Sequence, residues 1–199
     1  MASIAKTMFS ARVTNAVHDD LANITGLFHN GSGQEEACAA GFLCTRSALL
    51  DSEAYADVKN ENAWIMVGAT SAANVGTGVY ACNSYNVNQI ADSVHGNVYK
   101  IGRSTLGLEV PAGERGTFTK IDFASGDKIY RFGECNIEGT IGANTFFTID
   151  AGLLKPAAAA PETAGAIYFE LIQTGSAIEG TYAAYGYVDV MAKYVAVAQ

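Results

Sequence analysis

The segment IYFEL, residues 167–171, places Ile167, Phe169 and Leu171 at every second position. The segment LGLEV, residues 106–110, places two leucines and a valine on one face in the same way. A repeat of two residues is the period of a β-strand that buries one of its faces. These two stretches therefore predict a fold built from strands.

Further short segments of this kind follow in the second half of the chain, and glycines separate them. Glycine favours tight turns because it adopts backbone conformations that other residues avoid. In the first half, continuous apolar runs at 64–67 and 79–82 predict strands covered on both faces. The other strands that we expect lie at 118–123, 128–132, 145–149, 182–191 and 194–197, with a hairpin turn at 125–127. Short strands at this spacing predict a mainly β fold, either a β-barrel or a β-sandwich.

Two segments have the spacing of a short helix. Val87, Ile90, Ala91 and Val94 recur at helical intervals, and Gly96 follows as a stop signal. Residues 17–28 place Val17, Leu21, Ile24 and Phe28 at similar intervals. We therefore expect a β fold with few short helices.

The chain divides into an extended N-terminal arm, residues 1–14, and a β-rich domain, residues 15–199, which is either single or split into two subdomains near 96–105. The arm mixes apolar with basic residues and has no clear strand or helix period. We expect it to dock on a neighbouring subunit or on another protein, with Phe9 as an apolar anchor and Lys6 or Arg12 meeting acidic groups. The competing interpretation makes it the first strand of the barrel. The segment KPAAAAPETAG, residues 155–165, predicts an exposed connection between two strands, since proline cannot donate to a central ladder.

Composition and charge exclude several classes of protein. Of the 199 residues, 49% are hydrophobic and 16% are charged, which is incompatible with a disordered chain. The net charge of -8, without a cluster of lysines and arginines, argues against nucleic acid as a partner. No apolar run reaches the roughly 20 residues that a membrane-spanning helix needs, and the N-terminus has no secretory signal pattern. We therefore expect no membrane partner and a soluble protein made in the cytoplasm.

The chain has four cysteines, Cys38, Cys44, Cys82 and Cys135, and their spacing matches neither a disulfide scaffold nor a zinc site. A thiol nucleophile would need Cys38 or Cys44 to meet a histidine in the fold, and the candidates are His18, His29 and His95. Alanines and Phe42 surround these cysteines, which favours a role as small buried hydrophobes.

Two other groups of residues suggest a binding site, one for a metal ion and one for phosphate, but neither matches the pattern that such a site requires. His18, Asp19 and Asp20, with His29, Glu35 and Glu36, suggest a metal site, but adjacent side chains point in different directions. The small-residue stretch 68–78 has neither glycine pattern of a phosphate loop. We therefore expect no catalytic residue, no cofactor-binding residue and no metal ligand.

Four segments together resemble a known family. They are the extended stretch Ser3 to Val13, the polar segment DLANITG at 20–26, the glycine-containing strand and turn LGLEVPAG at 106–113, and FFTID at 146–150. In style and order the chain resembles the decoration proteins of tailed-bacteriophage heads. The resemblance implies a virion structural protein on the outer capsid surface, made in the host cytoplasm. It would bind the major capsid protein, and neighbours of its own kind in the lattice or as a homo-oligomer, and would stabilise the capsid without cofactor or catalysis.

Two other classes of function remain open at this point. A carbohydrate-binding or adhesion β-domain would have the same strands and the same supply of aromatic residues. A small hydrolase that depends on Cys38 or Cys44 is the enzyme alternative.

Overall fold

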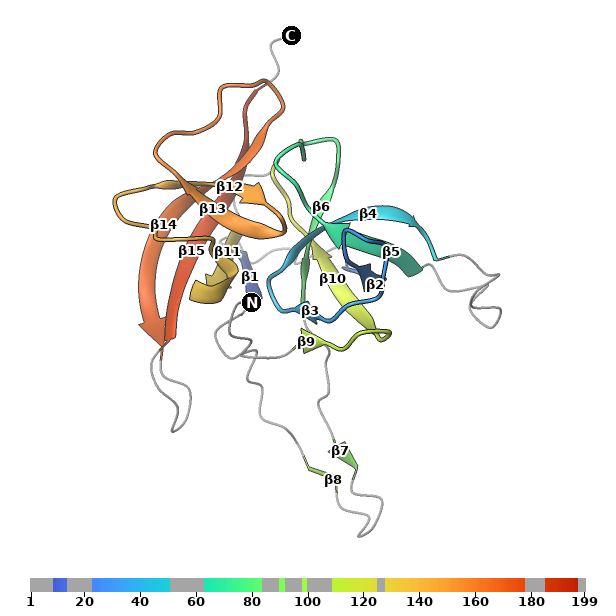
Figure 1. Ribbon diagram of the computed structural model, residues 1–199. Coiled ribbons are helices and arrows are strands. Elements are labelled where there is room, and N and C mark those ends of the chain that lie inside the picture. The colour runs from blue at the N-terminus through green and yellow to red at the C-terminus, as the bar shows by residue number, and fades with distance from the viewer. Residues whose placement is uncertain are drawn as a thin grey trace.

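The computed structural model describes residues 9–13, 23–50, 63–83, 90–91, 98–99, 109–124, 128–177 and 185–196. Within these residues the chain is mainly β, and it forms a closed barrel beside a six-stranded sheet (Figure 1). The fold class expected from the alternating segments is confirmed.

The barrel has five strands in the order β10-β2-β5-β4-β6. Their bounds are β2 (Asn23–His29), β4 (Leu43–Leu49), β5 (Ala63–Gly68), β6 (Val79–Cys82) and β10 (Arg115–Lys120). Strands β2 and β5 are parallel, and the other four neighbouring pairs are antiparallel. Closure leaves no unpaired edge and buries Met66 and Phe118 in one apolar cluster.

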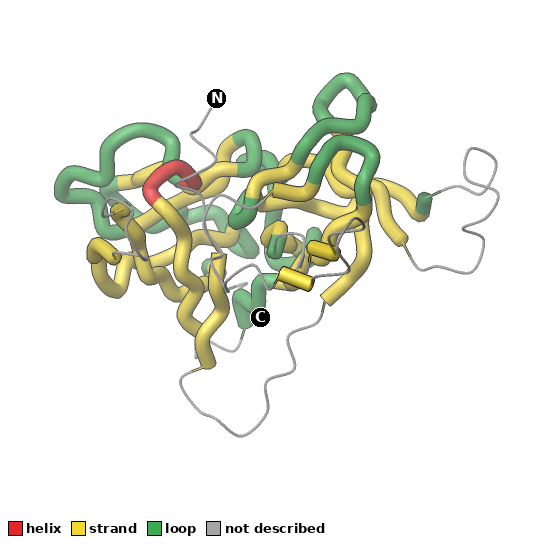
Figure 2. The backbone as a smooth tube through the Cα atoms, turned by 90° about the horizontal axis from the view of Figure 1, so that it is seen from below, coloured by secondary structure: helices red, strands yellow, loops and turns green. Residues whose placement is uncertain are grey.

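The sheet is antiparallel throughout, in the order β1-β11-β15-β14-β12-β13. Its strands are β1 (Phe9–Val13), β11 (Lys128–Gly133), β12 (Phe146–Asp150), β13 (Leu153–Ala157), β14 (Ile167–Ala177) and β15 (Tyr185–Tyr194). Two smaller ladders pair β3 (Cys38–Ala39) with β9 (Glu109–Val110), and β7 (Ile90–Ala91) with β8 (Val98–Tyr99). A single 3-10 turn, η3 (Glu134–Asn136), is the helical element of the described residues (Figure 2).

One hydrophobic core joins the barrel to the sheet. Leu43, Val79 and Ala81 from the barrel belong to the same buried cluster as Phe132 and Phe169 from the sheet. All four residues of β6 are buried, because β6 has the barrel interior on one side and this shared core on the other. The two β units therefore pack directly on each other.

The predicted strands at 128–132 and 145–149 are confirmed, within one residue at each end, as β11 and β12. The strand predicted at 167–171 is the first part of β14, which runs six residues further. Of the strand predicted at 118–123, residues 118–120 lie in β10 and residues 121–123 follow its end. The apolar run 79–82 is confirmed as the fully buried strand β6, whereas β5 leaves Trp64 and Val67 partly exposed. The strand expected at 182–191 is β15, which runs on to Tyr194, so the separate strand expected at 194–197 is wrong. Of the segment 106–110, the described part forms β9.

Both helix predictions are wrong where the structure describes them. Ile24 and Phe28 lie in β2, and Ile90 and Ala91 lie in β7. Residues four apart share a face on a strand as well as on a helix, so the spacing of Ile24 and Phe28 suited either element. Pairing of β2 with two barrel strands decides the outcome. Val17, Leu21, Val87 and Val94 lie outside the described residues.

Part of the N-terminal arm pairs within its own chain. Residues 9–13 form β1, an edge strand of the sheet rather than of the barrel, with Phe9 opposite Phe132. Residues 1–8 and 14, the turn at 125–127, and the boundary region 96–105 apart from 98–99 lie outside the described residues. The connection expected at 155–165 begins inside β13, so its first three residues belong to a strand. Pro156 is tolerated there because β13 lies at the edge of the sheet, where a missing N–H donor breaks no central hydrogen bond.

Candidate functional site

The largest hollow that we describe lies where the barrel meets the sheet. It has a volume of about 550 Å³, which is within the range of ligand-binding clefts. The barrel strands contribute Phe28 and Val67 to its wall, the residue just before β4 contributes Phe42, and the sheet side contributes Ala151 and Leu153 from the β12–β13 hairpin. We call this space the junction cavity.

The turn between β12 and β13 is hydrogen-bonded to the barrel through Gly152. The amide N–H of Leu43 donates to the Gly152 carbonyl at 2.8 Å, and the Gly152 N–H donates to the Ala69 carbonyl at 2.8 Å. The N–H of Ala69 in turn donates to the Leu43 carbonyl at 2.9 Å. The first two bonds hold the hairpin end against the barrel, and the third joins the two barrel segments that receive it.

Gly152 also allows the Phe42 ring to pack against the turn. Its φ of +80° lies in the left-handed region that favours glycine. A Cβ at this position would lie 2.2 Å from Cζ of Phe42, far inside van der Waals contact. Only a residue without a side chain lets the hairpin approach Phe42 so closely.

Two aromatic rings form the apolar wall of the junction cavity. The rings of Phe28 and Phe42 meet edge to face, with centroids 5.3 Å apart and an interplanar angle of 78°. Phe28 is buried, whereas Phe42 is half-buried and so keeps part of its ring open to the cavity. This arrangement offers an aromatic surface to an apolar group.

Asn136 holds η3 in place at the cavity. Its side chain is buried, its Nδ2 donates to the Ala40 carbonyl at 2.8 Å, and its Oδ1 accepts from the Gly133 N–H at 3.1 Å. One amide therefore links the sheet to the turn that precedes Phe42. Cys135 and Asn136 both contribute to the cavity wall.

The charged residues at the junction cavity are acidic. Glu36 and Glu109 contribute to its lining, and no lysine, arginine or histidine belongs to the part of the lining that the structure describes. Glu36 is exposed and Glu109 is half-buried, so both carboxylates are open to water. The cavity thus combines apolar walls with negative charge.

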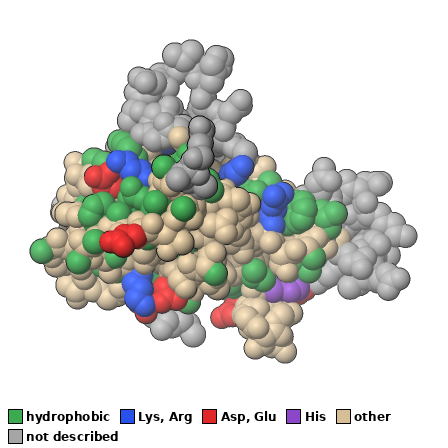
Figure 3. Space-filling view, turned by 90° about the horizontal axis from the view of Figure 1, so that it is seen from above, with side chains coloured by type: hydrophobic (Ala, Val, Ile, Leu, Met, Phe, Trp, Pro, Cys, Tyr) green, Lys and Arg blue, Asp and Glu red, His purple; other side chains and the backbone are tan. Residues whose placement is uncertain are grey.

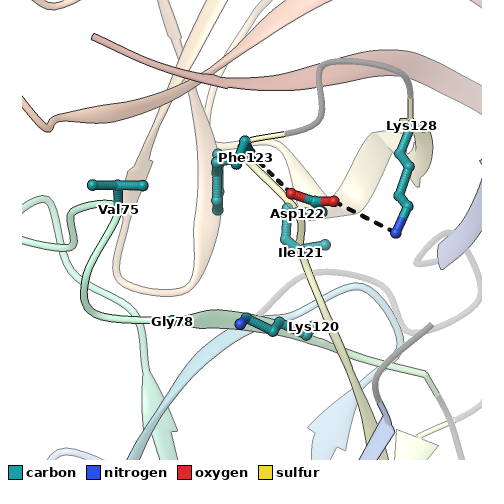
Figure 4. Close-up of a pocket in the computed structure, with 8 residues that line it drawn as sticks. Val75, Gly78, Lys120, Ile121, Asp122, Phe123 and Lys128 are labelled. Atoms are coloured by element: carbon teal, nitrogen blue, oxygen red, sulfur yellow. Dashed lines mark hydrogen bonds and ion pairs between the residues drawn. The ribbon is translucent and has the colours of Figure 1, made fainter. Parts of the chain in front are cut away.

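A second, smaller hollow of about 320 Å³ lies beside Val75, Lys120 and Phe123 (Figure 4). Asp122 accepts a hydrogen bond from the Ala124 N–H at 2.9 Å and forms an ion pair with Lys128 at 3.5 Å. The charge of Lys128 is thus already balanced inside the hollow. We take the junction cavity as the stronger candidate site.

The cysteines of the predicted nucleophile are buried inside the barrel. Cys38, Cys44 and Cys82 belong to one apolar cluster, and the Cys82 thiol donates to the Cys38 carbonyl at 3.5 Å. Burial raises the pKa of the Cys38 thiol well above its ordinary value, and it raises the pKa of Cys44 as well. A catalytic thiol needs a lowered pKa, so both groups are shifted away from reactivity.

The residues of the imagined metal site are not brought together. His18, Asp19, Asp20 and His95 lie outside the described residues, and within the described ones no group of three potential ligands converges. His29 forms an isolated bridge with Glu35 through the backbone. The His29 Nε2 is buried and has no hydrogen-bond partner in the part of the chain that is described.

Basic side chains lie apart from one another on the face of the molecule shown in Figure 3, where neutral and apolar side chains separate them. In the described part of the chain, no helix is long and apolar enough to cross a membrane. No protein-family model matches the sequence, and no curated protein or solved structure matches it either.

The sequence interpretation missed the junction cavity. Its lining comes from segments as far apart as Phe28, Glu109 and Leu153, which no local pattern connects. The turn AG at 151–152, between two alternating segments, was the one local signal near it.

Proposed function

We propose that this protein is a non-enzymatic virion component that decorates the head of a tailed bacteriophage. It binds the major capsid protein on the outer capsid surface and stabilises the lattice. The observation that carries the proposal is a preformed apolar cavity at a hydrogen-bonded junction between two β units. A protein that binds another protein needs a rigid surface with an apolar anchor point rather than titrating groups of shifted pKa.

Two features of the described residues support a binding role over catalysis. The thiols that would serve as nucleophiles have raised pKa values because they are buried. The charged pairs at the surface, such as Lys155 with Asp150 at 2.6 Å, are ordinary ion pairs of a strand edge. The major capsid protein is proposed as the partner because the sequence resembles head decoration proteins.

Co-sedimentation tests the proposal directly. The purified chain is mixed with capsids assembled from the major capsid protein of the phage that encodes it, and bound protein is quantified in the pellet. We expect saturable binding and a higher melting temperature of the decorated capsids. A chain that stays in the supernatant at all concentrations contradicts the proposed function.

The carbohydrate-binding alternative depends on an aromatic face that a sugar ring can cover. The most prominent candidate, Trp64, has the Arg46 guanidinium over its ring at 4.6 Å, and the same guanidinium lies 5.5 Å from the Tyr80 ring. One face of Trp64 is therefore already occupied. Binding on a glycan array that is lost in Trp64→Ala would favour the carbohydrate function over capsid decoration.

A further inference from the structure

The junction cavity has a defined chemistry that narrows what it binds. Its walls are mostly apolar and include the half-buried ring of Phe42, and its volume of about 550 Å³ is ample for a large side chain. Three lining residues, Gly31, Glu36 and Ala37, belong to the loop 31–37, and every residue of this loop is exposed. The mouth of the cavity lies at this loop. An occupant can therefore enter from the surface and leave its remaining atoms outside.

The negative charge of the lining determines which charged group an apolar ligand can carry. Glu36 and Glu109 both face this space, and the described lining has no cation to balance them. An anionic group would meet repulsion, a neutral one would gain only from the apolar walls, and a cation beside the apolar group would gain from both. The complementary occupant is an apolar body with an ammonium or guanidinium group next to it.

We propose that the junction cavity binds a partner-protein segment in which an aromatic or large aliphatic side chain is adjacent to a lysine or arginine. The apolar side chain packs against Phe28 and Phe42, and the cation lies at the mouth near Glu36 and Glu109. The pairing of an apolar side chain with a cation is inferred from the cavity alone. The assignment of this segment to the major capsid protein rests on the proposed function.

The rigidity of the cavity favours a protein segment as its occupant. The Gly152 and Asn136 hydrogen bonds hold the wall in place before binding, so little ordering is needed on the side of this chain. Anchoring one side chain in a preformed apolar pocket, with charges at the rim, is the usual arrangement of an interface hot spot. A free organic amine is the competing occupant, and the test includes it.

The binding test uses three capped peptides on the isotope-labelled full chain. Acetyl-Gly-Phe-Lys-Gly-amide is compared with the same peptide carrying Glu in place of Lys, and with one carrying Ala in place of Phe. Phenethylamine serves as the free amine. Backbone amide shifts in the nuclear magnetic resonance spectrum report both affinity and location.

We expect the Phe-Lys peptide to shift the amides of Gly31, Thr70 and Ala151, which line the cavity. It should bind at least about threefold more tightly than the Phe-Glu peptide, an effect in the range of one exposed ion pair. No detectable binding up to about 10 mM, the edge of measurable affinity, overturns the proposal, and so does equal binding of the two peptides. Tighter binding of phenethylamine than of the peptide shows an amine site and overturns the protein segment as occupant.

Variants separate the two parts of the anchor. Glu36→Gln with Glu109→Gln should abolish the preference for Lys over Glu, whereas Glu162→Gln, at an exposed acid away from the cavity, should leave it unchanged. Ala37→Trp should fill the mouth and weaken binding of the Phe-Lys peptide about tenfold, the loss of one well-packed anchor. Ala159→Trp places the same side chain on another exposed loop and should have no effect. Unchanged affinity in a folded Ala37→Trp protein overturns the location.

Capsid co-sedimentation with the same variants distinguishes this inference from the proposed function. If the wild-type chain and Ala37→Trp bind capsids equally, decoration stands and the cavity is not the capsid contact. If the wild-type chain does not bind capsids but the peptide preference holds, the proposed function fails and the anchor chemistry stands.

Discussion

Replacing Gly152 by alanine tests whether the close packing of the β12–β13 turn on Phe42 holds the barrel and the sheet together. Two separate penalties act at this position. The φ of +80° is a conformation that alanine adopts at a cost of roughly 1–2 kcal/mol. The added Cβ would also lie 2.2 Å from Cζ, 2.4 Å from Cε1 and 2.6 Å from Cε2 of Phe42.

The overlap with the Phe42 ring is the penalty specific to this position, and a matched variant isolates it. Forcing one extra methyl into a packed site costs about 1–3 kcal/mol, so Gly152→Ala should lower the free energy of unfolding by about 2–5 kcal/mol in total. Gly139 has a φ of +86° and nothing within 4 Å of its would-be Cβ. Gly139→Ala should therefore show the backbone penalty alone, about 1–2 kcal/mol.

Urea unfolding followed by far-UV circular dichroism measures both variants against the wild-type chain. We expect the difference between them, about 1–3 kcal/mol, to shrink when Phe42→Leu is added to Gly152→Ala, because the smaller side chain relieves the overlap. Equal destabilisation by Gly152→Ala and Gly139→Ala would falsify the argument that the Phe42 contact determines the residue at position 152.

Three further predictions concern the core. Asp189 is buried and accepts from Arg131 Nε at 2.6 Å, from Arg131 Nη2 at 2.7 Å and from Gln173 Nε2 at 2.7 Å. Asp189→Ala should therefore destabilise the chain by about 3–5 kcal/mol, and the double change Arg131→Met with Asp189→Leu should destabilise it less; equal losses in urea unfolding would contradict the pairing. Asn136→Ala leaves the Gly133 N–H and the Ala40 carbonyl without their partner and should lower the free energy of unfolding by about 2–4 kcal/mol, against little change for Gln34→Ala at an exposed amide side chain; a loss below about 1 kcal/mol would rule out this bridging role. Because burial raises the folded-state pKa of Cys38 and Cys44, their contribution to stability is complete below the unfolded pKa of about 8.5 and declines as the pH rises above it, by up to about 1.4 kcal/mol per pH unit for each thiol. Urea unfolding between pH 7 and 10 should show this decline, and Cys38→Ala with Cys44→Ala should flatten it; an unchanged slope in that variant would assign the decline to other groups.

Sequence patterns predicted those elements that depend on neighbouring residues, and they failed for elements that depend on pairing with distant segments. Strands such as β14 and β12 were predictable because one buried face imposes a two-residue period on neighbouring positions. The helix expected over 17–28 failed because a spacing of four suits both elements, and the choice between them came from β10 and β5 on either side of β2. Local patterns therefore predicted strands where alternation was clear, and they failed where the spacing of apolar residues suited two elements.

The sequence by itself determined a β fold, since alternation along strands that bury one face, and glycines at the turns between strands, are local properties. Only the tertiary structure decided that five of these strands close into a barrel, that six others form a sheet, and that both share one core. It also decided the junction cavity, which needs Phe42, Gly152 and Asn136 to meet although about 100 residues separate the first from the other two. Contacts at that separation depend on how whole units pack, and packing of units leaves no periodic trace in the order of residues.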